Sequence, residues 1–249
     1  MSDSVLVRRE HSCTVLTINR PDTHNAVNKQ VAEHLGLALE AANEDPSVRT
    51  VILTGSGDNF CAGADLKAVA RGEAIRPTDA RRNAWGFAGY VDHPVSKPTI
   101  AAVNGPAVGG GFELVLASDL AVAADTAYFA LPEVRHGIFA AAGGTSRLPM
   151  QLAPKFALNA ILTGDRLSVG DALSLGLINS ISRPADLLDE ALRIASLIAA
   201  NPANAVSAAL RVARAAPRSG RMPDASSRDL AAKEWSALQA AAQRRRLTK

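Results

Sequence analysis

The chain carries, at residues 100–114, the stretch IAAVNGPAVGGGFEL. Its first four residues are uniformly apolar, which is typical of a short buried strand. The consecutive glycines Gly109, Gly110 and Gly111 let a ligand or another backbone approach closely. We expect a helix from about Gly110, and the unpaired N–H groups at its start can bind negative charge. Taken alone, such a turn also fits a close strand-to-helix crossover with no function.

The segments on either side of this stretch predict an α/β layered core. Residues 5–9 and 13–18 are rich in apolar and β-branched side chains and predict an opening hairpin. From Asn28 the apolar residues recur at helical spacing, and residues 51–53 and 120–123 predict further buried strands. After about residue 184 the strand signals stop and Ala/Leu-rich helical segments follow. We therefore expect an α/β core over residues 1–183 and a helical region over residues 184–249.

Glu113 is the first candidate for chemistry. It lies between Phe112 and Leu114 on a helix that is apolar nearly all round, so it is predicted to be buried. A buried carboxylate requires a partner, a shifted pKa or a task. Glu133 follows a proline at the end of a β-rich stretch and, taken alone, is interpreted as a solvated loop residue.

A third feature is the run of small residues from Cys61 to Leu66, just beyond the strand at 51–54. The carboxyl edge of an α/β sheet is where ligands commonly bind, so this run could supply a second backbone donor. Two amides that converge on one carbonyl oxygen form an oxyanion hole, which typically contributes about 3 to 4 kcal/mol of transition-state stabilisation per donor. Two carboxylates beside it could move protons.

At this point the sequence closely resembles the enoyl-CoA hydratase/isomerase, or crotonase, superfamily. The resemblance spans about residues 12–182, and its pieces together are very specific: Asn19-Arg20-Pro21 with Asn25-Ala26, residues 60–66, residues 97–105, residues 109–114, Pro132-Glu133, and Gly143-Gly144-Thr145 with Arg147-Leu148. The resemblance implies a spiral of ββα units followed by a C-terminal helical region for trimerisation, with trimers often pairing into hexamers.

The same resemblance assigns the site. It implies that the thioester carbonyl of an acyl-CoA binds between the backbone N–H groups of Ala64 and Gly110. The two glutamates of the hydratases correspond to Glu113 and Glu133, twenty residues apart as in the hydratase pattern. Further substrate or coenzyme A contacts are expected at these positions: Asn25, Ala26, Ala62, Gly63, Asp65, Leu66, Gly109 and Ala141.

The expected function is that of an enoyl-CoA hydratase, a hydro-lyase that adds water to a 2-enoyl-CoA in fatty-acid or related metabolism. One departure keeps alternatives open: hydratases often have Pro-Gly shortly after the second glutamate, where this chain has Ala140-Ala141. The methyl group of Ala141 could crowd the water. The alternatives are an enoyl-CoA isomerase, a carnitinyl-CoA-type dehydratase, and a non-catalytic acyl-CoA-binding protein.

Composition limits the other possibilities. Hydrophobic residues make up 47% of the 249 residues, so a core can form without a metal or disulfides, and Cys13 and Cys61 are interpreted as buried thiols. No apolar run suits a signal peptide or a membrane span, so we expect a cytoplasmic protein.

We expect no metal and no cofactor, since coenzyme A is part of the substrate, and no nucleic-acid or membrane partner. Residues 201–249 hold ten Lys/Arg against three Asp/Glu, ending in the run Arg244-Arg245-Arg246, which is interpreted as a solvated tail. This region could also supply a cation for the coenzyme A phosphates. The dinucleotide-binding alternative fails because Phe60 occupies the third glycine position after Gly55-Ser56-Gly57.

Overall fold

The computed structural model describes residues 3–215, 230 and 233–237. Its main sheet has six strands in the order β1-β2-β3-β4-β6-β9, parallel except for the β1–β2 pair. These strands are β1 Val5–Glu10, β2 Cys13–Ile18, β3 Thr50–Gly55, β4 Thr99–Val103, β6 Leu120–Ala124 and β9 Ser180–Ser182. The predicted hairpin is confirmed by the register Val5↔Ile18 to Glu10↔Cys13.

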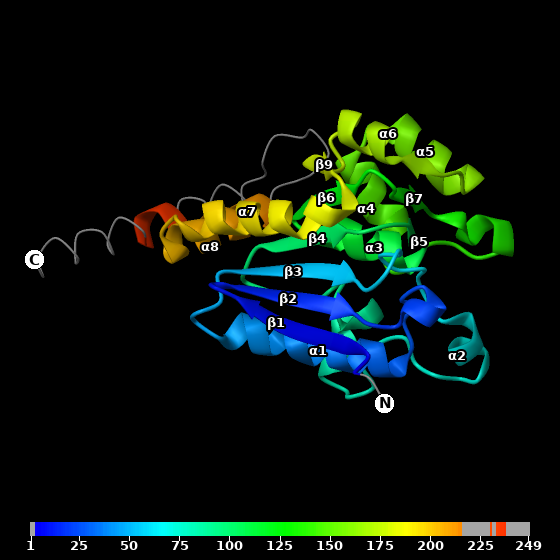
Figure 1. Cartoon of the computed structure of the whole chain (residues 1–249), viewed down its shortest axis with the longest axis horizontal. Coiled ribbons are helices and arrows are strands. Elements are labelled where there is room, and N and C mark those ends of the chain that lie inside the picture. Colours follow the sequence, from blue (N-terminus) through cyan, green and yellow to red (C-terminus); the bar gives the residue numbers. More distant parts are fainter. Residues whose placement is uncertain (1–2, 216–229, 231–232, 238–249) are drawn as a thin grey trace, which may run out of the picture.

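Helices cover both faces of this sheet, as Figure 1 shows with α1 on one side and α7 on the other. Helix α1, Lys29–Glu44, starts where predicted, because the side chain of Asn28 accepts a hydrogen bond from the N–H of Val31. Helix α7, Leu187–Ala199, buries Leu187, Ala191 and Ala195 against the opposite face. The α/β core is confirmed.

A second, smaller sheet carries the strands around the glycine-rich turn. It consists of β5 Ala107–Val108, β7 Tyr128–Ala130 and β8 Leu167–Ser168, in the order β5-β7-β8. Strands β5 and β7 are parallel, with Ala107 opposite Phe129 and Val108 opposite Ala130. Because parallel strands end at the same edge, the segments that follow β5 and β7 emerge side by side.

The remaining helices lie between and after these strands in the chain. They are α2 Leu66–Ala70, α3 Gly110–Ala117, α4 Gly144–Gln151, α5 Pro154–Thr163, α6 Val169–Ser174 and α8 Ala203–Ala215, with short 3-10 helices η1 Pro21–Thr23, η2 Arg82–Trp85, η3 Phe87–Gly89, η4 Pro132–His136 and η5 Pro184–Asp186. A third C-terminal helical segment and the Arg244–Arg246 run were also expected; they lie largely outside the described residues.

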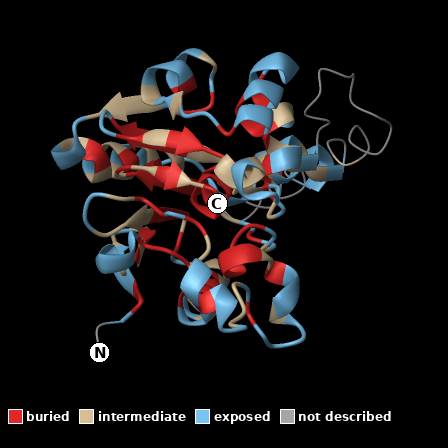
Figure 2. Cartoon of the chain, turned by 90° about the vertical axis from the view of Figure 1, so that its right-hand side faces the viewer, coloured by how far each residue is buried: buried red, intermediate tan, exposed pale blue. Residues whose placement is uncertain are grey.

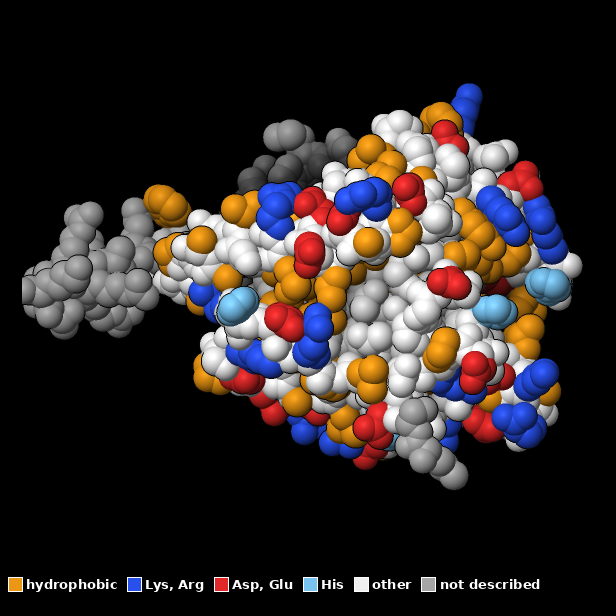
Figure 3. Space-filling model, viewed as in Figure 1, with side chains coloured by type: hydrophobic (Ala, Val, Ile, Leu, Met, Phe, Trp, Pro, Cys, Tyr) orange, Lys and Arg blue, Asp and Glu red, His pale blue; other side chains and the backbone are white. Residues whose placement is uncertain are grey.

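Most of the residues in the central strands are buried, as the red colouring in Figure 2 shows. Both cysteines are buried free thiols, as predicted. On the face in Figure 3 the basic and acidic side chains are interspersed. No helix within the described part of the chain is long and apolar enough to cross a membrane.

Candidate active site

Three chain segments that run in the same direction end together at the site. Residue Cys61 forms a parallel bridge with Ala107 of β5, and β5 pairs in parallel with β7. The first segment leads to Ala64, the second to Gly110 and the start of α3, and the third to η4. The candidate site therefore lies at the carboxyl ends of these segments.

The segment that carries Ala64 lies against the start of α3. A parallel bridge joins Ala64 to Val27, in which the N–H of Val27 donates to Gly63 O at 2.7 Å and the N–H of Asp65 donates to Val27 O at 2.9 Å. The neighbours of Ala64 thus pair with Val27, and the N–H of Ala64 itself points to the other side. The start of α3 lies close to this segment, since a Cβ built on Gly63 would lie 2.9 Å from Gly110 N.

Neither amide has a partner elsewhere in the described chain. Among residues 3–215 no acceptor is hydrogen-bonded to the N–H of Ala64 or of Gly110. Gly110 is the first residue of α3, where N–H groups lack intrahelical acceptors and the helix dipole is positive. Two unpaired donors beside each other fit the oxyanion hole predicted for these residues.

Glu113 lies one turn into α3 and is 3% exposed. Its Oε1 accepts a hydrogen bond of 2.7 Å from the N–H of Gly144, at the start of α4. Burial raises the pKa of Glu113 to about 7, and the nearby carboxyl group of Glu133 adds to this rise, while the Gly144 amide opposes it. A carboxyl group that titrates near neutral pH is suited to exchange protons with a substrate.

Glu133 is brought to the same place by η4. A Cβ on Gly109 would lie 3.1 Å from Glu133 Oε1, so this carboxyl group lies against the backbone that enters α3. The interpretation of Glu133 as a solvated loop residue is wrong: its Oε2 is buried and has no hydrogen-bond partner among the described residues, and burial raises its pKa. Pro132, the first residue of η4, is the sequence signal for this placement, because proline is favoured in the first turn of a helix.

The other predicted binding residues surround these groups in different ways. Asn25 is fully buried, and its side chain bonds to the backbone of Arg20, Ser56 and Asn59. Ala26 is buried as well, whereas Ala62, Leu66 and Ala141 are exposed. Their contacts with a substrate stay predictions.

The sequence did not reveal what holds the Ala64 segment. The Nη1 of Arg20 donates to Ala26 O at 2.6 Å and to Asp65 Oδ2 at 3.0 Å, and Asp65 also caps α2 by accepting from Ala68 N. Hydrogen bonds and the Arg20 cation lower the pKa of Asp65 against the opposing effect of burial. The pairing joins residues 45 positions apart, which spacing alone does not predict.

Residues 140–141 lie on the turn before α4. Ala140 is buried, and a Cβ on Gly144 would lie 2.8 Å from Ala140 Cβ and 3.1 Å from Glu113 Oε1. The turn therefore requires glycine at position 144. Between Glu133 and this turn the side chains of Ile138 and Phe139 are exposed, at 59% and 63%.

Trp85 of η2 and Phe87 of η3 are both buried. Trp85 stacks on His93, with ring centroids 4.2 Å apart, which agrees with a packing role. Phe87 lies instead against the start of α3, where a Cβ on Gly110 would lie 2.6 Å from its Cε1.

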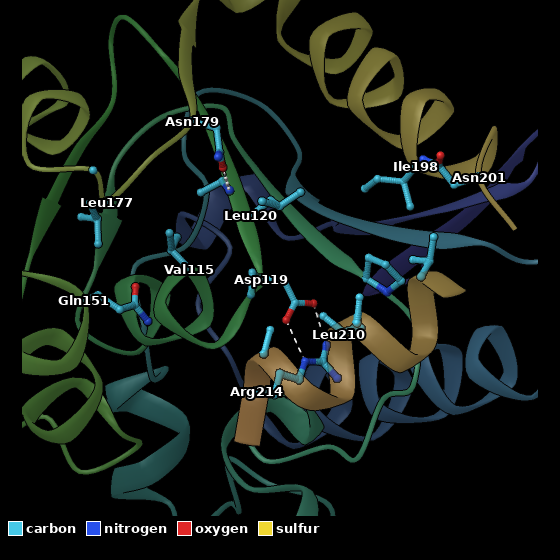
Figure 4. Close-up of a pocket in the computed structure, with 17 residues that line it drawn as sticks. Val115, Asp119, Leu120, Gln151, Leu177, Asn179, Ile198, Asn201, Leu210 and Arg214 are labelled. Atoms are coloured by element: carbon cyan, nitrogen blue, oxygen red, sulfur yellow. Dashed lines mark hydrogen bonds and ion pairs between the residues drawn. The ribbon is translucent and has the colours of Figure 1, made fainter. Parts of the chain in front are cut away.

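A separate cavity lies at the other end of α3. It has a volume of about 650 Å³ and is lined by residues that include Val115, Leu177 and Leu210. Figure 4 shows the ion pair between Asp119 and Arg214 at its edge, in which Arg214 Nη2 lies 2.6 Å from Asp119 Oδ2. Arg214 thereby attaches α8 to the start of β4, since Asp119 also accepts from the N–H of Thr99.

The raised pKa of Glu113 predicts a stability effect. The folded-state pKa exceeds the unfolded value near 4.5, so an ionised Glu113 costs about 3 kcal/mol at pH 8, and this cost disappears as pH falls from about 7 to below 4.5. Glu113→Gln is therefore expected to raise the free energy of unfolding at pH 8, and chemical denaturation at pH 8 and pH 4 measures it. An equal effect at both pH values would contradict the raised pKa.

Comparison with known proteins identifies the family. The sequence model of the enoyl-CoA hydratase/isomerase family matches residues 8–245. A carnitinyl-CoA dehydratase from Proteus mirabilis is 40% identical over 217 residues, which cover 86% of this chain and 82% of that protein.

Two solved structures agree with this assignment. The structure of a carnitinyl-CoA dehydratase from Mycobacterium avium 104 is 52% identical, with a TM-score of 0.83 over 85% of this chain and 82% of its own. The enoyl-CoA hydratase EchA1 from Mycobacterium marinum is 38% identical, with a TM-score of 0.88 over 96% of this chain and 91% of its own. The expected crotonase-type fold is thereby confirmed, and the chain belongs to the enoyl-CoA hydratase/isomerase family.

Proposed function

We propose that this protein is a hydro-lyase of acyl-CoA thioesters, which adds water across the 2,3 double bond of a 2-enoyl-CoA and catalyses the reverse dehydration. The observation that carries the proposal is the convergence of two carboxyl groups, those of the buried Glu113 and the half-buried Glu133, on the helix start that presents the unpaired amides. Acid–base groups beside an oxyanion hole are what hydration of an enoyl thioester requires.

In the proposed mechanism the thioester oxygen accepts hydrogen bonds from the N–H groups of Ala64 and Gly110. Glu113 removes a proton from water while the water oxygen bonds to C3. The π electrons of the double bond move to the thioester oxygen, where the two amides and the positive end of α3 stabilise the enolate. Glu133 then gives its proton to C2. The pKa of about 7 leaves Glu113 partly ionised at neutral pH, and burial raises the pKa of Glu133 from its ordinary value as well.

The proposal includes no metal and no separate cofactor, because proton transfer and enolate stabilisation come from the chain itself. It also includes a homotrimer or a dimer of trimers, for which the exposed Ile138 and Phe139 offer apolar surface beside the site. A cytoplasmic location stays a prediction.

A second candidate is the dehydration of carnitinyl-CoA, the activity in the names of several relatives. It is the same elimination of water, from a thioester whose acyl group ends in a trimethylammonium group. The Ala140-Ala141 turn in place of Pro-Gly also favours a substrate other than a simple enoyl-CoA.

Parallel assays test the two candidates. The protein is mixed with crotonyl-CoA, and loss of the conjugated enoyl-thioester absorbance is followed; with carnitinyl-CoA the same absorbance should rise. We expect turnover of at least one thioester, and the larger kcat/KM identifies the better substrate class. Mass spectrometry must show gain or loss of one water, since isomerisation of a 3-enoyl-CoA leaves the mass unchanged. Saturable binding of both thioesters without turnover would instead indicate a non-catalytic acyl-CoA-binding protein.

A further inference from the structure

The guanidinium group of Arg147 folds back over the start of its own helix, α4. Its Nη1 donates to Ala142 O at 2.9 Å, and its Nη2 donates to Val91 O at 2.7 Å and to Asp92 Oδ1 at 2.8 Å. A Cβ on Gly143 would collide with this group, and Gly143 has a φ of 110°, so both space and backbone require glycine there. Arg147 thus lies flat on the turn.

This turn is the one that contacts Glu113. Gly144, which follows Gly143, donates its N–H to Glu113 Oε1 at 2.7 Å. The Ala142 amide, just before Gly143, also acts on this carboxyl group and lowers its pKa. A change in the orientation of the Gly143–Gly144 peptide therefore changes the 2.7 Å hydrogen bond that holds this carboxyl group.

At its other end Arg147 contacts the segment that carries Phe87. Val91 and Asp92 follow Phe87 closely, and the N–H of Val91 donates to Phe87 O at 3.3 Å. The Phe87 ring packs against Gly110, whose amide is one of the two predicted oxyanion donors. One side chain consequently joins the turn beside Glu113 to the segment that supports Gly110.

We propose that Arg147 is a positioning residue, whose guanidinium group holds the turn before α4 so that the Gly144 amide stays directed at Glu113. The proposal rests on the proposed function, in which Glu113 is the base. The hydrogen bonds of Arg147 go to Ala142, Val91 and Asp92, so it acts on Glu113 through the Gly144 turn.

Charge gives this role a measurable signature. Burial and Glu133 on η4 raise the pKa of Glu113, whereas the amides of Gly144 and Ala142 and the cation of Arg147 on α4 lower it. Loss of Arg147 removes the cation and loosens the Gly144 donor, and both changes raise the pKa of Glu113. A base must be ionised, so the acidic limb of the activity profile moves to higher pH.

The test compares Arg147→Met and Arg147→Lys with a matched control. Arg49 likewise clamps two backbone carbonyls, those of Ala199 and Asn201, but lies outside the site, so Arg49→Met removes an equivalent clamp. For each variant the Glu113 carboxyl group is titrated by 13C NMR, assigned by the loss of its signal in Glu113→Gln. The kcat and KM are measured against pH for the thioester that the wild type turns over.

For Arg147→Met we expect the Glu113 titration and the acidic limb to move up by about 1 pH unit. We also expect kcat at the plateau to fall roughly 10- to 100-fold with a smaller change in KM, because the base is misdirected. Arg147→Lys keeps the charge without the planar fork, so it should show a smaller shift in the same direction. Arg49→Met should lower only the melting temperature.

An unchanged Glu113 titration in Arg147→Met, with only a lower melting temperature, would overturn the proposal and leave Arg147 a structural clamp like Arg49. If the Met variant is not recovered folded, the Lys variant decides in the same way. The NMR titration needs no turnover, so a wild type that fails to hydrate any thioester refutes the proposed function without obscuring the outcome for Arg147.

Discussion

Glu113→Gln and Glu133→Gln are each expected to lower kcat by roughly 10² to 10⁴, the range typical of a lost general acid or base. Glutamine has the shape of glutamate, and its Oε1 can still accept from Gly144 N, so the turn before α4 should persist. The variants therefore lose proton transfer and keep the site's shape. Steady-state kinetics with the better of the two thioesters measures the effect.

The double variant shows whether Glu113 and Glu133 act together in one reaction step or contribute independently. If both carboxyl groups act on the same water and enolate, the loss in Glu113→Gln/Glu133→Gln should be far smaller than the product of the single losses. Glu190→Gln serves as the control, because Glu190 pairs with Arg193 on α7 and is far in sequence from the site. Near-normal turnover in either single variant would refute the role assigned to that residue.

Binding should survive these changes. Calorimetric titration with a saturated acyl-CoA, which cannot be hydrated, is expected to give similar dissociation constants for wild type and both variants. A large loss of affinity would mean that the carboxyl groups serve substrate binding, and the acid–base assignment would then need replacing.

Much of the fold followed from local signals in the sequence. The hairpin, the helix from about Asn28 and the buried strand at 51–53 each depend on residues close together in the chain, and each was found where expected. The buried Glu113 was predicted for the same reason, since its helical neighbours are all apolar.

Tertiary pairing was not predictable in this way. The burial of Glu133 depends on β5 and β7 ending at one edge, which only the sheet order reveals. The contacts of Arg20 with Asp65 and of Arg147 with Asp92 join residues 45 and 55 positions apart. In the sequence these four charged residues resemble ordinary surface charges, because the neighbouring residues do not indicate which distant loop each will contact.

Gly110→Ala is the second change with a large expected effect, a loss of kcat of roughly 10² to 10³, as for removal of one oxyanion donor. The new Cβ would lie 2.6 Å from Phe87 Cε1 and 3.1 Å from Phe87 Cε2. Either the ring or the start of α3 must move, and movement of α3 displaces the Gly110 amide from the thioester oxygen. The same assay measures the loss.

The matched control is Gly170→Ala on α6. A Cβ on Gly170 would meet only Ser168 Oγ, at 3.9 Å, so this change adds a methyl group in open space and should leave kcat unchanged. Replacing glycine by alanine in a helix is also expected to stabilise the fold by about 0.5 to 1 kcal/mol. Because both variants replace glycine by alanine, a loss of kcat in Gly110→Ala alone is due to the position of the new methyl group.

A second substitution, at Phe87, tests why Gly110→Ala loses kcat. If the ring causes the displacement, adding Phe87→Leu to Gly110→Ala should recover much of the lost kcat, because a smaller side chain leaves room for the new methyl group. If the double variant stays as slow as Gly110→Ala, the methyl group itself obstructs the thioester. Unchanged kcat in Gly110→Ala would mean that the Phe87 ring gives way and the Gly110 amide keeps its place, and the expected loss would be wrong.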